Sequence, residues 1–79
     1  MEKMIVKLSE PIQSGSEVIT ELIADRPLKA KDFRGLSTKL TFDDSLILVS
    51  RLFAQPAHVI DELQAKDMMV AMEVVNSFL

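Results

Sequence analysis

Few residues carry the chemistry needed for metal binding or acid–base catalysis, and they fall on two predicted helices. His58 precedes Asp61 and Glu62 at the i, i+3 and i+4 spacing that places three side chains on one side of a helix. A metal site needs more ligands than these, and the sequence has no other histidine and no cysteine. The paired carboxylates Asp43 and Asp44 lie at a predicted helix start, where acids are favourable without any catalytic role. We therefore interpret both groups as surface residues and expect no metal.

Nucleophiles and phosphate-binding loops are equally poorly supported. The seven serines have no partner base in a recognisable order. Gly15 and Gly35 are the only glycines and do not form a phosphate-binding loop. We expect a protein that is not an enzyme and that has no catalytic, cofactor-binding or metal-binding residues.

Length and composition indicate one globular domain over residues 1–79. The hydrophobic fraction is 48%, which is too high for a disordered chain. No apolar run approaches the roughly 20 residues of a membrane span, and the first ten residues lack the apolar region of a signal peptide. We expect a cytosolic domain with no membrane partner.

Charge is distributed unevenly along the chain. Residues 26–39 carry five basic groups and one acid, whereas the segments on either side are acidic. Acid-rich ends would be repelled by a phosphate backbone, so we expect no nucleic-acid partner. The basic segment is interpreted as a solvated helix face, with contact to an acidic partner as the alternative.

The first part of the sequence has strand periodicity. Met4, Val6 and Leu8 alternate with Ile5 and Lys7. A segment rich in β-branched residues at 18–24 follows a turn-forming segment at 13–16. We predict an antiparallel hairpin over about residues 4–24, with Pro11 limiting the first strand. A helix over 17–24 is the competing prediction.

The remainder predicts three to four short helices, giving an α+β fold. They are expected at about residues 29–36, 43–54, 56–63 and 67–79, with Gly35 ending the first. Thr41 and Asp44 form a capping-box pattern, and Pro56 suits a first helical turn. A break near residues 64–66 is expected, because in one continuous helix from 56 to 79 the early apolar face would point in a different direction from the later one. Asp67 would then be a cap or first-turn acid of the last helix.

Two of these helices are unusually apolar. In the helix at 43–54, apolar residues spread nearly all round the axis, which predicts the buried centre of the domain. The last helix has an apolar arc wider than one contact needs, and its methionines suit an adaptable surface. Packing into the core is the competing interpretation. The predicted partner-binding residues are Met68, Met69, Val70, Met72, Val75, Phe78 and Leu79, with Met69 or Val70 outside the core.

The order of these features resembles the small tail assembly chaperones of Mu-like contractile-tailed temperate phages. The similarity covers nearly the whole chain and includes Leu8-x-x-Pro11 with Gly15, Arg26-Pro27, LILVSRLFAQP, and Ile60-x-x-Leu63-x-x-x-Asp67 with Phe78-Leu79. Its specificity comes from the co-occurrence of these patterns in order.

The resemblance implies a non-catalytic role. Such chaperones keep the tape measure protein soluble in the host cytoplasm until tail-tube subunits polymerise around it, and they are absent from the mature virion. Many relatives also have a longer frameshifted form, which would be a second partner. A free hairpin edge independently makes homo-oligomerisation a reasonable expectation.

Two other functions are compatible with the sequence. One is a small homo-oligomeric adaptor or antitoxin-like module that dimerises through its hairpin. The other is a nucleic-acid-binding regulator that uses residues 26–39 and would bind DNA in a salt-dependent manner.

Overall fold

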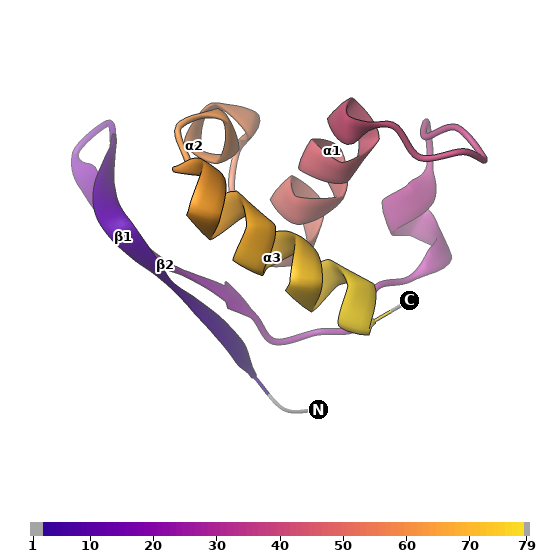
Figure 1. Ribbon diagram of the computed structural model, residues 1–79, viewed down its shortest axis with the longest axis horizontal. Helices are drawn as coiled ribbons and strands as arrows, with labels where there is room; N and C mark the ends of the chain where they lie inside the picture. The colour runs from indigo at the N-terminus through magenta and orange to yellow at the C-terminus, as the bar shows by residue number, and fades with distance from the viewer. Residues whose placement is uncertain (1–2, 79) are drawn as a thin grey trace.

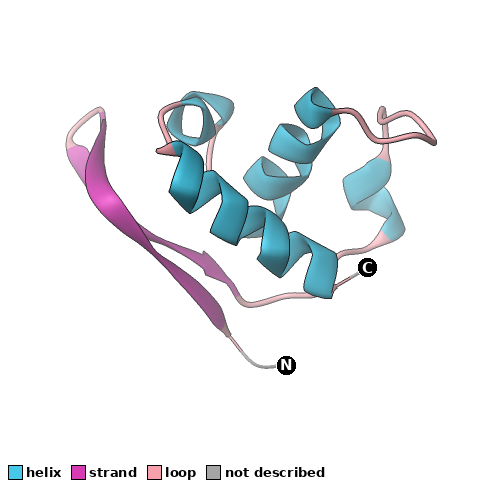
Figure 2. Ribbon diagram, in the orientation of Figure 1, coloured by secondary structure: helices cyan, strands magenta, loops and turns pink. Residues whose placement is uncertain are grey.

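The first elements of the structure form an antiparallel β-hairpin (Figures 1 and 2). This computed structural model describes residues 3–78. Strand β1 (Met4–Ser14) pairs with β2 (Glu17–Ala24) around a two-residue turn. Gly15 adopts φ 61° at the first turn position, where a type II′ turn requires a positive φ that glycine tolerates. The predicted hairpin over residues 4–24 is confirmed, and the competing helix over 17–24 is wrong.

A long bulge in β1 interrupts the pairing of the two strands. Pairing runs from Met4↔Ala24 to Lys7↔Glu21 and resumes at Ile12↔Ile19, so residues 8–11 lie opposite residue 20 alone. Pro11 falls in this segment, where its missing N–H breaks no ladder hydrogen bond. The strand therefore continues past Pro11, contrary to the expectation that Pro11 would limit it, but its regular pairing with β2 is interrupted there.

The segment after the hairpin contains less helix than predicted. A helix was expected over residues 29–36, but only the 3-10 helix η1 (Ala30–Phe33) forms. Gly35 follows it with φ 83°, consistent with its predicted role in ending the helix.

Three α-helices follow: α1 (Phe42–Phe53), α2 (Ala57–Asp61) and α3 (Ala65–Ser77). The Thr41 side chain accepts from the Asp44 backbone N–H, and the Asp44 carboxylate accepts from the Thr41 N–H, so the predicted capping box is present. Pro56 caps α2 rather than occupying its first turn. The predicted break falls at residues 62–64, slightly earlier than expected, and Asp67 lies in the first turn of α3.

The core lies between the inner face of the hairpin and the three α-helices. α3 packs against β1 and α1, and α1 also contacts α2 and β2; Figure 1 shows the hairpin on one side of this helical layer. The hairpin contributes Val6, Ile12, Ile19, Leu22 and Ala24, and the helices contribute Leu48, Val49, Leu52, Phe53, Val59, Ile60, Met68, Ala71, Val74 and Val75. The α+β fold predicted from the sequence is therefore present.

The helix α1 supplies four core residues but is not buried on all sides. Leu48, Val49, Leu52 and Phe53 face inward, whereas Ile47 is exposed and Leu46 is half-buried. The expectation of a helix buried all round is therefore wrong, because one apolar side remains uncovered. Within residues 3–78, no helix is long and apolar enough to cross a bilayer.

Candidate functional site

The seven partner-binding residues predicted on the last helix do not share one environment. Met68 and Val75 are buried, while Met72 and Phe78 are half-buried and pack against the core. Met69 and Val70 are 64% and 46% exposed. Leu79 lies outside the described residues. Met69 and Val70 are therefore the described members of this set most available to a partner.

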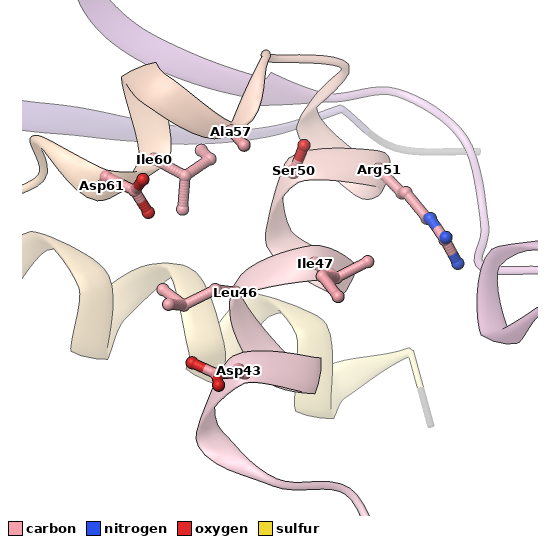
Figure 3. Close-up of a pocket in the computed structure, with 8 residues that line it drawn as sticks. All are labelled: Asp43, Leu46, Ile47, Ser50, Arg51, Ala57, Ile60 and Asp61. Carbon is pink, nitrogen blue, oxygen red and sulfur yellow. The ribbon is translucent and has the colours of Figure 1, made fainter. Parts of the chain in front are cut away.

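An apolar hollow of about 350 Å³ lies between α1 and α2 (Figure 3). Leu46 and Ile47 of α1 form one wall, and Ala57 and Ile60 of α2 form the other. Leu46 and Ile60 point toward each other in the close-up, with the Asp43 and Asp61 carboxylates at the margins. The complete lining is Asp43, Leu46, Ile47, Ser50, Arg51, Ala57, Ile60 and Asp61.

A second hollow of about 320 Å³ adjoins the first and extends to the start of α3. The two hollows share Leu46, Ile60 and Asp61, so they meet at these residues. The other lining residues are Phe42, Leu63, Ala65, Met68 and Met69. We call the two hollows together the α1–α2–α3 groove. Exposed Met69 belongs to this groove, whereas Val70 does not line it.

Local sequence explains why the groove stays open. The capping box at Thr41 starts α1, and Ala54 ends it in the left-handed conformation at φ 55°. Pro56 then caps α2, which is only five residues long. The short α2 contacts α1 but leaves Ile47 exposed and Leu46 half-buried.

An ion pair with a buried carboxylate fixes the segment beside α1. The two terminal nitrogens of Arg26 each donate to one oxygen of the Asp32 carboxylate at 2.9 Å. Nη2 also donates to the Arg51 carbonyl oxygen at 2.8 Å. The Asp32 side chain is 5% exposed. Hydrogen bonding from Arg26, assisted by the Lys29 backbone N–H, lowers the pKa of Asp32 from 3.8 to about 2.

Arg51 completes this arrangement from α1. Its Nη1 donates to the carbonyl oxygens of Asp32 and Arg34 at 2.6 and 2.9 Å. The basic segment is thus not simply a solvated helix face, because Arg26 holds Asp32 in the interior. The sequence reasoning missed this pair; the lone acid among five basic groups was the available signal.

A second buried acid joins α3 to the β1 bulge. Asp67 accepts hydrogen bonds through Oδ2 from the Ser9 backbone N–H at 3.0 Å and from Ser9 Oγ at 2.8 Å. The bulged N–H therefore finds a partner on α3 instead of on β2. Asp67 was predicted as a first-turn acid, but its link to a residue 58 positions away was not foreseen.

Two of the three residues considered for metal binding, His58 and Glu62, line a separate polar hollow, whereas Asp61 lines the groove. His58 Nε2 lies 3.0 Å from Ser14 Oγ at the end of the hairpin, and Gln64 donates to Glu10 at 3.0 Å. Among residues 3–78, no group of three or more His, Cys, Asp or Glu side chains is arranged to hold a metal ion. The α1–α2–α3 groove, apolar and open, is therefore the candidate functional site.

Comparison with known proteins adds no relative to this picture. No family model matches the sequence, and neither the search of curated proteins nor the search of solved structures gives a significant match.

Proposed function

We propose that this chain is a tail assembly chaperone of a contractile-tailed temperate phage, which binds the tape measure protein and keeps it soluble without catalysis. One structural observation supports this role above the others. The apolar α1–α2–α3 groove continues onto the exposed Met69 of the last helix. The family resemblance of the sequence supplies the identity of the partner.

The groove has the properties that such a chaperone needs. A tape measure protein is long, largely helical and apolar along its faces. An open apolar groove can receive one face of an amphipathic helix, and Met69 supplies an exposed side chain that adapts to different contacts. Many weakly bound copies along one long partner give high avidity, yet each copy can be displaced separately as tube subunits arrive.

The same proposal places the protein in the host cytoplasm during tail assembly and outside the mature virion. It also includes homo-oligomers and a longer frameshifted form as partners. Met72, Val75 and Phe78, which lie in the core or pack against it, would then hold α3 in place rather than contact the partner directly.

Co-expression with the tape measure protein tests this function. The partner is the product of a very long coiled-coil reading frame in the same gene cluster. We expect most of it to be insoluble when expressed alone and to become soluble, and to co-purify, when this chain is present. A tape measure protein that stays equally insoluble in both cases would contradict the proposal.

A homo-oligomeric adaptor is the second candidate, and the outer face of the hairpin favours it. Ile5 and Ile23 form a cross-strand pair on the face away from the core, and both are exposed, as is Val18. Contact between two such faces would cover apolar surface that a two-stranded sheet otherwise leaves in water. Sedimentation velocity over a hundredfold concentration range tests this second candidate, since a protein that stays monomeric throughout contradicts it.

A further inference from the structure

The rim of the α1–α2–α3 groove carries two acids that no neighbour neutralises. Asp43 lies in the first turn of α1, and Asp61 is the last residue of α2. Both are exposed, and Figure 3 shows their carboxylates at the margin of the first hollow. Asp61 also lines the second hollow. Within residues 3–78, neither carboxylate lies in an ion pair.

The basic residue at the groove does not offset these charges. Arg51 is the only basic residue among the described side chains that line the two hollows. Its guanidinium donates to the carbonyl oxygens of Asp32 and Arg34 and points away from Asp61 in Figure 3. The mouth of the groove is therefore apolar in the centre and negative at the margin.

We propose that the groove binds an amphipathic helix whose apolar anchors are flanked by lysine or arginine. Two adjacent hollows that share Leu46 and Ile60 in their lining suit two apolar side chains on one helical face, which recur at three- or four-residue spacing. Basic residues beside those anchors would meet Asp43 and Asp61, whereas acidic ones would be repelled. The inference rests on the proposed function only for the source of the helix, which would be a segment of the tape measure protein.

Paired synthetic peptides test this charge selection. Two labelled 18-residue amphipathic helices share the same leucine face, and one has lysines and the other glutamates beside it. We expect the lysine peptide to bind at least about tenfold more tightly by fluorescence anisotropy at low salt, with a smaller ratio at high salt because exposed charges are screened. The Asp43→Asn/Asp61→Asn variant should reduce the ratio to about twofold.

A matched variant separates the groove from the overall negative charge. Glu17→Gln/Glu73→Gln removes the same number of charges at exposed positions outside the groove, and it should keep the preference of the unmodified chain. The inference is overturned if neither peptide binds, if Asp43→Asn/Asp61→Asn keeps the full preference, or if both double variants lose it equally.

The outcome is separable from that of the co-expression experiment. If the groove prefers the lysine peptide but the tape measure protein stays insoluble on co-expression, this inference is retained and the proposed function is removed. A soluble tape measure protein without charge selection would retain the function and remove this inference.

Discussion

Asp32 shows how one side chain joins segments that are distant in the sequence. Its carboxylate accepts hydrogen bonds from Arg26, and its backbone carbonyl oxygen accepts a hydrogen bond from Arg51 of α1. A carboxylate so little exposed is stable in its charged form only while Arg26 and the Lys29 N–H donate to it. Asp32 and Arg26 therefore fix the connection between the hairpin and α1.

Acid titration should reveal this role. The pKa of Asp32 is lowered to about 2 in the folded chain, so its contribution to stability is complete above about pH 4 and is lost as the pH falls toward 2. The lowered pKa corresponds to about 2 kcal/mol at neutral pH. Asp32→Asn should lower the free energy of unfolding by about that amount at pH 7, measured by urea denaturation.

The difference between the unmodified chain and Asp32→Asn should shrink between pH 4 and pH 2. Asp61→Asn, at an exposed position, serves as the control and should follow the unmodified chain at every pH. A constant difference over this range would show that the Asp32–Arg26 pair does not have the role described.

At the scale of elements, the bulge in β1 and the first turn of α3 hold each other in place. The bulge leaves the Ser9 N–H without a strand partner, and Asp67 accepts that N–H together with the Ser9 hydroxyl. The helix dipole at the start of α3 also favours the Asp67 carboxylate. This contact orients α3 on the hairpin and so fixes the position of Met69 in the groove.

Substitutions at the two residues should therefore be coupled. Asp67→Ala is expected to cost about 2–3 kcal/mol of stability, because it leaves the Ser9 N–H unpaired, and Ser9→Ala about 1 kcal/mol. In a double-mutant cycle measured by urea denaturation, the coupling energy should be about 1 kcal/mol. Strictly additive effects of Asp67→Ala and Ser9→Ala would contradict a direct contact.

The elements themselves were largely predictable from sequence, since each has a local cause. Gly15 marks the hairpin turn, Thr41 with Asp44 begins α1, and Pro56 begins α2. The bulge was not predictable, because it depends on Asp67 far along the chain. Likewise, the 3-10 turn that stands in place of the predicted helix at 29–36 contains Asp32, whose partner Arg26 lies outside that segment.

The site was predictable only in part. The wide apolar arc of the last helix correctly indicated that Met69 and Val70 would lie outside the core. The arc could not show that Met68 and Val75 pack inward, nor that Ile47 and Phe42 on α1 would remain uncovered. Those facts depend on how α1, α2 and α3 cross, which periodicity within one helix does not specify.

At the scale of the whole molecule, a small α+β domain leaves a continuous apolar groove open on its helical side. Phe42 and Met69, at the second hollow, are 63% and 64% exposed. A chain of this size gains little from leaving such side chains in water. We account for them as a surface for a long helical partner.

The most direct test compares Met69→Asp with Leu40→Asp in the co-expression experiment. Both replace an exposed apolar residue with one charge, but Met69 lines the groove and Leu40, 41% exposed, does not. Neither change should alter stability by more than about 0.5 kcal/mol, because both residues are exposed and lie outside the core; thermal unfolding verifies this. Met69→Asp should reduce the soluble tape measure protein at least about tenfold, and Leu40→Asp should leave it unchanged. Equal amounts of soluble tape measure protein with both variants would contradict the groove as its binding site.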